Sequence, residues 1–266
     1  ENGVKLNSSF KSKINFDENY LNKYSKFFNK HNFNHKIRNL KGDFANNLFI
    51  DFDNTYKIKD YNYKIIGEIK NSNLELRNII KNDFLREEIK NIYFSDLKIE
   101  TIFVPNNIIF NGDGKYSLDN SDFLKINFTN DFNNNLINLK LDLDFKNSFA
   151  IDLINFKKIN NSTANLIIEL KKKKNEINIT RLNFEDGKNL IKIKDIIFQN
   201  NKFSNFKRLE IKTQKNNFFI QKDSKILIKG NKFDASNLAK FLSSQGSKNG
   251  LQKINSEIEI DFKSVK

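Results

Sequence analysis

Apolar and polar residues alternate with a period of two along most of the chain. From Val4 to Phe16 every second residue is apolar or small, and the residues between are mostly polar. The clearest later run carries Ile137, Leu139, Leu141, Leu143 and Phe145. Successive side chains of a strand point to opposite faces of a sheet, so this alternation predicts strands with one apolar and one charged face.

Similar runs recur through the sequence, with turn residues between them. They lie at residues 61–69, 124–128, 166–170, 177–179 and 258–262, with shorter ones in between. Clusters such as Asn106-Asn107 and Asn216-Asn217 separate the runs. Asn and Asp tolerate the left-handed backbone and bond their own backbone, which favours tight turns. We therefore predict a mainly β protein built as one long antiparallel meander.

Two segments break the alternation and have helical spacing. In residues 17–30, aromatic residues and Leu21 recur every three or four positions after Asp17, a residue suited to an N-cap. In residues 234–244, Asp234 precedes an apolar stripe of the same spacing. Residues 82–90 are a weaker helical candidate. Because no Pro-rich or Ser-rich linker divides the chain, we expect one continuous architecture over residues 1–266.

The apolar strand faces need cover, and short helices cannot cover so many strands. Two arrangements would solve this problem. The sheet can fold onto itself as a sandwich, barrel or solenoid, which is what most sheets do. Alternatively, it can curl into an elongated, half-barrel-like groove whose apolar interior holds another molecule, for which acyl chains are suitable. The pattern alone leaves both open.

Charge adds little to this picture. The chain has 266 residues and a formal net charge of +14. Basic and acidic residues alternate along the same stretches, and the aromatics follow the apolar stripes, so we expect no nucleic-acid partner. The basic run Lys171–Lys174 is typical of a solvated hairpin turn rather than a phosphate-binding patch. The excess of positive charge suits anionic surroundings in general, such as a lipid headgroup layer, without specifying one.

Candidate chemistry is sparse. The chain has no Cys, which excludes disulfides and thiolate metal sites. His31 and His35 have the spacing of two zinc ligands on a helix, but no third ligand is evident and we interpret them as loop residues. No apolar run is long enough to span a membrane as a helix.

Two acidic patterns also have a simpler interpretation. Residues 111–115 (Asn-Gly-Asp-Gly-Lys) resemble a calcium loop, but Lys115 stands where an oxygen ligand is required, and we predict a hairpin turn there. The pairs Asp51/Asp53 and Asp142/Asp144 lie on the polar strand face, where they serve solubility. We expect no catalytic residues, no metal and no cofactor.

One segment is more distinctive. Residues 225–242 contain a strand that ends at Gly230, the step Phe233-Asp234-Ala235 and a helical stripe, with a new alternating run after it. This order resembles the strand, G-x-x-F-D-A, helix and strand element of the AsmA-like family, in particular its YhdP-type branch. Residues 19–28, followed by residues 37–42, are similar to that family's Leu-x-x-Tyr/Phe helix and I-x-x-L-x-G step.

The resemblance implies an envelope protein of diderm bacteria. Such proteins are tethered to the inner membrane by an N-terminal helix, form a long curled β-sheet with a hydrophobic groove, and are implicated in phospholipid transport towards the outer membrane. It also implies that this chain is a segment of a longer periplasmic protein, because it begins with Glu and carries no anchor.

We therefore expect a non-enzymatic groove for phospholipid acyl chains, in contact with the membranes through parts outside this chain. Candidate lining residues are Ile137, Leu139, Leu141, Leu143 and Phe145. The alternative is a self-packed sandwich or solenoid that serves as a scaffold or adhesion module without a ligand.

Overall fold

The computed structural model describes residues 3–17, 20, 35–81, 88–159, 162–200, 202–237 and 257–265. These residues are almost entirely β-structure, which confirms a mainly β protein with an antiparallel meander. Their contacts define two compact units. Unit 1 comprises Glu1–Lys81 and Glu88–Leu143, and unit 2 comprises Asn82–Glu87 and Asp144–Lys266.

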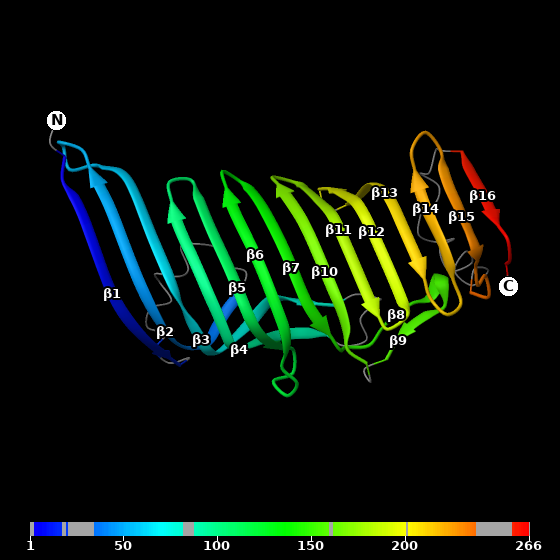
Figure 1. Cartoon of the computed structure of the whole chain (residues 1–266), viewed down its shortest axis with the longest axis horizontal. Coiled ribbons are helices and arrows are strands. Elements are labelled where there is room, and N and C mark those ends of the chain that lie inside the picture. The colour runs from blue at the N-terminus through cyan, green and yellow to red at the C-terminus, as the bar shows by residue number, and fades with distance from the viewer. Residues whose placement is uncertain are drawn as a thin grey trace. The chain divides into compact units, whose positions relative to one another are not determined.

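Unit 1 is a sheet in which the strand order follows the chain (Figure 1). Its strands are β1 (Lys5–Phe16), β2 (His35–Phe52), β3 (Ile58–Ile80), β4 (Ile89–Val104), β5 (Asn107–Ser117), β6 (Leu124–Asn133) and β7 (Leu136–Phe145). Each pairs with the next in antiparallel orientation. Among the described residues β1 and β7 do not pair with each other, so the sheet is open.

The strand register places most of the apolar residues of unit 1 on one face. One row across the sheet consists of Ser12, Phe44, Gly67, Ile99, Gly112, Phe128 and Leu141. The opposite face carries charged residues that pair across strands, such as Lys64 with Glu100 at 2.6 Å. The period-two pattern of the sequence thus becomes a sheet with two different faces.

One end of this face is covered by its own strands. Figure 1 shows β3 and β4 turning near one end of the sheet. Register shifts lie there, and Asp96 in β4 has a positive φ of 50°. Such bulges bend and twist strands. Beyond the bend, Ile92 and Phe94 pack against a buried cluster of Leu97, Tyr116 and Ile126. The other end of the face has no such cover among the described residues.

Unit 2 contains the later strands of the 14-stranded sheet and a covering hairpin, which is a separate two-stranded sheet. Its sheet strands are β10 (Ala164–Lys173), β11 (Glu176–Asp186), β12 (Asn189–Gln199), β13 (Lys202–Lys212), β14 (Asn217–Lys222), β15 (Ile226–Lys232) and β16 (Ile258–Phe262). The pairs are antiparallel except that β16 lies parallel to β15. The hairpin consists of β8 (Phe149–Ile151), the 3-10 turn η2 (Asp152–Ile154) and β9 (Phe156–Lys158).

Bulges keep the apolar residues of unit 2 on one face. The sequence spacing between Ile179 and Leu182 breaks the period of two. In the sheet, Ile179 pairs with Leu170 while Leu182 pairs with Ile168, so one residue of β11 is extra. An extra residue in one strand is the definition of a β-bulge. Both apolar side chains therefore stay on the same face.

The hairpin covers one end of this face. Phe149 and Phe156 pack edge-on against Phe184, with ring centroids 4.9 and 6.1 Å apart. Asn216 is fully buried and joins the hairpin to the sheet: its Nδ2 donates to the carbonyl of Ile154 at 2.6 Å. Its Oδ1 accepts from the amide of Asp234 at 2.9 Å.

A buried lysine fixes the end of the hairpin. The ammonium of Lys158 donates to the carbonyls of Lys146, Ile159 and Ser162 at 2.9, 2.9 and 2.7 Å. Desolvation lowers the pKa of Lys158. The three carbonyls supply the acceptors that a buried ammonium needs.

The predicted helices lie mostly outside the described residues. Asp17 accepts a hydrogen bond from the helical Tyr20 amide at 3.0 Å, as its predicted N-cap role requires, and residues 21–30 are outside. Residues 234–237 are irregular or a turn, and 238–244 are outside. For the candidate at 82–90, residues 82–87 are outside. The helix is wrong at residues 89 and 90, which belong to β4.

Two finer expectations are corrected. The predicted turn at residues 111–115 is wrong, because these residues lie inside β5. Each unit also has an open sheet without the strong curl of a half-barrel. Curling and closure require neighbouring strands to be staggered. Tight hairpins, such as Val104 paired with Asn107 and Asn133 paired with Leu136, keep neighbouring strands level.

We predict that Asn216→Ala lowers the free energy of unfolding of the chain by about 2 kcal/mol, since two buried backbone groups lose their partners. Chemical denaturation measures this change. Asn217→Ala, at the exposed neighbouring position, serves as the control and changes stability little. Equal stability of both variants would contradict the role given to Asn216.

We also predict a pH dependence at Asp234. Hydrogen bonds from Ser236 and Asn155 lower the pKa of this carboxyl from 3.8 to about 2. A lowered pKa contributes stability above the unfolded value, and this contribution is lost as the pH falls through the folded value. The melting temperature of Asp234→Asn therefore falls less than that of the wild type between about pH 4 and about pH 2. Identical declines would contradict this assignment.

Candidate functional site

The uncovered end of the unit 1 face is the candidate site. A row there joins Leu48, Tyr63, Phe103, Ile108, Phe132 and Ile137 on six consecutive strands, and we call these residues the open strip. The side chains of Ile108 and Phe132 are 39% and 43% exposed. The rings of Tyr63 and Phe103 stack with centroids 5.8 Å apart. The strip is therefore a continuous apolar surface in contact with solvent.

In the row next to the open strip, glycines leave room for the phenyl rings of neighbouring strands. A Cβ on Gly112 would lie 2.4 Å from ring atoms of Phe128 on β6. A Cβ on Gly67 would lie 2.5 Å from the ring of Phe44 on β2. Each phenyl ring thus occupies the space above a glycine of the next strand. This packing explains why residues 111–115 form a strand with glycines rather than a turn.

A small polar cluster interrupts the apolar face near β1. Asn46 is 4% exposed and donates to the hydroxyl of Ser12 at 3.0 Å. The hydroxyl of Tyr63 donates to Oδ1 of Asn46 at 2.8 Å. These bonds satisfy the amide within the sheet, so the cluster is a structural part of the face.

The structure divides the predicted lining residues. Ile137, Leu139, Leu141 and Leu143 share the apolar face of β7. Ile137 belongs to the open strip, whereas Leu141 and Leu143 pack against the buried cluster at the covered end. Phe145, the last residue of β7, belongs to unit 2 and contacts Phe149 of the hairpin in that unit, with ring centroids 6.1 Å apart.

The sequence analysis did not select the other members of the open strip. Phe103, Ile108 and Phe132 each belong to an alternating run, but runs on separate strands become one row only through the strand register. The short turns between Val104 and Asn107 and between Asn133 and Leu136 were the available signal for that register. Unit 2 has a comparable exposed aromatic group at Phe198, Phe203 and Phe206, of which Phe203 is 60% exposed.

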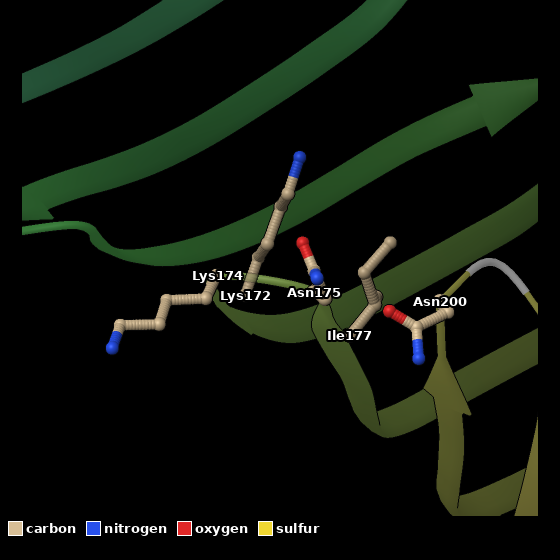
Figure 2. A pocket seen from close by; sticks show the side chains of 5 residues that line it. All are labelled: Lys172, Lys174, Asn175, Ile177 and Asn200. Atoms are coloured by element: carbon tan, nitrogen blue, oxygen red, sulfur yellow. The ribbon is translucent and has the colours of Figure 1, made fainter.

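The lysine run lies in a hairpin, as predicted. Lys171–Lys173 end β10, and Lys174 has the positive φ of a tight turn, 51°. A pocket of about 310 Å³ lies beside it, lined by Lys172, Lys174, Asn175, Ile177 and Asn200. Figure 2 shows the Lys172 and Lys174 side chains extending in different directions. This shallow polar pocket offers no apolar channel for an acyl chain.

Asp53 lies in the turn after β2 rather than on a strand face as predicted, and it has a structural role there. Asp53 accepts bonds from the amide and hydroxyl of Thr55 at 2.8 and 2.7 Å, and from the amide of Lys57 at 3.0 Å. These bonds hold its pKa below the ordinary value. Within the described part of the chain, no group of three or more His, Cys, Asp or Glu residues is placed to hold a metal ion. His31 is outside the described residues.

Among the residues that the structure describes, no helix is both long enough and apolar enough to cross a bilayer.

Comparison of the chain with known protein families, with curated proteins and with solved structures gives no match. The likeness to the AsmA-like family therefore stays a prediction from the sequence motifs.

We predict that Gly112→Ala destabilises unit 1, because its Cβ displaces the Phe128 ring, at a cost of about 1 to 3 kcal/mol. The double variant Gly112→Ala/Phe128→Leu has a smaller side chain at the contact and recovers part of this loss. Denaturation of both single variants and the double variant gives the coupling between the two positions. Additive effects would contradict the packing described.

Proposed function

We propose that this chain is a non-enzymatic lipid-binding protein whose open apolar sheet face holds acyl chains of phospholipids. The open strip supports the proposal most directly: six apolar or aromatic side chains lie side by side on one surface, and two of them are about two-fifths exposed. Contiguous exposed apolar patches in soluble proteins mark interaction sites for ligands, proteins or membranes.

The binding mechanism would be passive. Burial of apolar surface contributes about 25 cal/mol per Å². Covering a row of aliphatic and aromatic side chains with an acyl chain removes apolar area on both partners from water. Apolar contact has no directional requirement, so a chain can shift from one side chain to the next without a covalent step.

The open sheet changes where the lipid is placed. The sequence predicted an elongated, half-barrel-like groove formed by curling of the sheet, and the acyl chains are instead proposed to lie on the uncovered face of unit 1. The opposite face, with cross-strand pairs such as Lys64 and Glu100, would stay in water. The net charge of +14 is compatible with approach to anionic headgroups.

The cellular setting is proposed from the sequence motifs alone. The Gly230 to Ala235 element and residues 19–28 are similar to AsmA-like proteins, so we place the chain in the periplasm of a diderm bacterium. There it would be a segment of a longer protein that is anchored to the inner membrane and takes part in phospholipid movement between the two membranes.

A scaffold without a ligand is the second candidate. It is favoured by unit 2, whose own hairpin covers one end of its apolar face through Phe149, Ile154 and Phe156. Under this function the open strip would be covered by protein and would not take up lipid.

Substitution in the open strip tests the proposal. We predict that Ile137→Asp lowers the amount of phospholipid that co-purifies with the protein, because a carboxylate on the strip disfavours contact with acyl chains. Solvent extraction followed by mass spectrometry measures the bound lipid. Asn138→Asp introduces the same charge on the opposite face and serves as the matched control.

Two results would contradict the lipid proposal. One is wild-type protein without bound phospholipid after exposure to phospholipid vesicles. The other is equal lipid content in the Ile137→Asp and Asn138→Asp variants, with both folds intact by circular dichroism.

A further inference from the structure

The apolar face of unit 2 also extends beyond its covered end. The covered cluster includes Leu182, Ile193 and Leu209, which lie opposite one another on β11, β12 and β13. The next row towards the hairpin turns lies outside this cluster, and we call it the inner row: Leu170, Ile179, Ile196 and Phe206 on β10 to β13. Across four strands about 4.8 Å apart, the inner row spans about 14 Å of apolar surface.

The row after it reaches the hairpin turns and contains a lysine. It consists of Lys172, Ile177, Phe198 and Phe203, and we call it the outer row. Directly paired residues point to the same face of a sheet, so Lys172 stands on the apolar face and not on the charged one. Phe203 is 60% exposed, and its ring centroid lies 6.2 Å from that of Phe198. The apolar surface of unit 2 therefore ends beside a cation.

Lys172 forms no ion pair among the described residues. Its neighbours Lys171 and Lys173 point to the opposite face, because side chains alternate along a strand. Glu176 lies opposite Lys173 on that other face, and Glu169 is also on it. The acidic residues nearest to Lys172 in the sequence are thus on the wrong side of the sheet to neutralise its charge.

Side-chain amides surround this cation. The turns after β10 and β12 are joined by the backbone amide of Asn200, which donates to the carbonyl of Asn175 at 2.9 Å. Both residues line the pocket of about 310 Å³ together with Lys172 and Ile177. Figure 2 shows the side chains of Lys172, Asn175 and Ile177 extending to the same side of the ribbon, whereas Lys174 extends elsewhere. The polar pocket therefore adjoins the outer row through two shared residues.

We propose that unit 2 binds a phospholipid, with the phosphate beside Lys172 and the acyl chain on the outer and inner rows. An ammonium and side-chain amides donate hydrogen bonds to phosphate oxygens, and the charges strengthen them. Contact with Ile177 and the phenylalanine rings removes the acyl chain from water. A cation and an apolar surface that adjoin on one face match the two parts of a phospholipid.

This inference rests on the proposed function for its class of ligand, but it uses a different site and adds a contact with the headgroup. Interpretation of the lysine run as a solvated turn gave Lys172 no such role. Because phosphate is common to all phospholipids, the site distinguishes them from neutral lipids with the same acyl chain.

A label in unit 2 tests the site separately from the open strip. The chain has no native Cys, so Phe203→Cys can carry a single environment-sensitive fluorophore at the exposed end of the outer row. Three probes are titrated at concentrations where each is monomeric: a lysophosphatidylglycerol, the monoacylglycerol with the same acyl chain, and glycerol phosphate. We expect a blue shift with the lysophospholipid, about tenfold weaker binding of the monoacylglycerol, and no shift with glycerol phosphate.

Two neighbouring lysines provide matched variants of the labelled protein. Lys172→Glu should weaken binding of the lysophospholipid about tenfold or more and leave that of the monoacylglycerol almost unchanged, because only the phosphate contact is lost. Lys171→Glu introduces the same charge on the opposite face and should weaken lysophospholipid binding much less. Circular dichroism checks that both variants are folded.

Three results would overturn the proposal. They are an equal loss of lysophospholipid binding in folded Lys171→Glu and Lys172→Glu, equal affinity for the lysophospholipid and the monoacylglycerol, and a Phe203→Cys label that responds to none of the probes. Ile137→Asp in the open strip should leave the response of the unit 2 label unchanged. Failure of the unit 2 label to respond, while Ile137→Asp still lowers co-purified phospholipid, would reject this site and leave the proposed function of unit 1 intact.

Discussion

The structure depends on one constraint: each sheet has an apolar face that a single layer of strands cannot cover. Tight hairpins keep the strands level, so side chains of one parity gather on one side across each unit. In the part of the chain that the structure describes, one end of each unit's apolar face is covered. In unit 1 the bent strands β3 and β4 fold towards the face, and in unit 2 the β8–β9 hairpin lies on it.

The covered end of unit 2 is held by polar groups with complete sets of partners. Asn216 joins η2 to the segment after β15, and Lys158 has three carbonyl acceptors. Buried polar groups with satisfied bonds specify one arrangement, because any shift leaves a donor or acceptor unpaired. The covered end is therefore a fixed core, whereas Ile108 and Phe132 of the open strip are exposed to solvent.

The strands were predictable from the sequence because their signal is local. Residues 137–145 alternate cleanly and form β7, and the residues 216–217 turn signal precedes β14. The bulges were less predictable: a break such as that between Ile179 and Leu182 looks like the end of a strand until its partner shows that one residue is extra. The predicted turn at residues 111–115 failed similarly, since Gly112 is required by the Phe128 ring of another strand.

The sequence predicted the kind of surface that forms the candidate site, an apolar strand face, but not which residues belong to the site. The alternating pattern predicted more apolar strand surface than short helices could cover. It also placed Ile137 of β7 on that surface, as the structure shows. Which residues stay open depends on where β4 bends and on where the hairpin of unit 2 packs. Those choices rest on contacts between distant parts of the sequence, such as Asn216 with Ile154, and no local pattern encodes them.

The central claim is that the open strip is exposed to solvent in the free protein and contacts acyl chains when phospholipid is bound. An environment-sensitive fluorophore on Phe132→Cys, with Asn133→Cys on the opposite face as reference, measures this directly. We expect the Phe132 label to report water in the free protein and to shift to the blue with phospholipid vesicles, while the Asn133 label does not change. The account would be contradicted by a Phe132 label that reports an apolar environment in the lipid-free protein and does not change when vesicles are added.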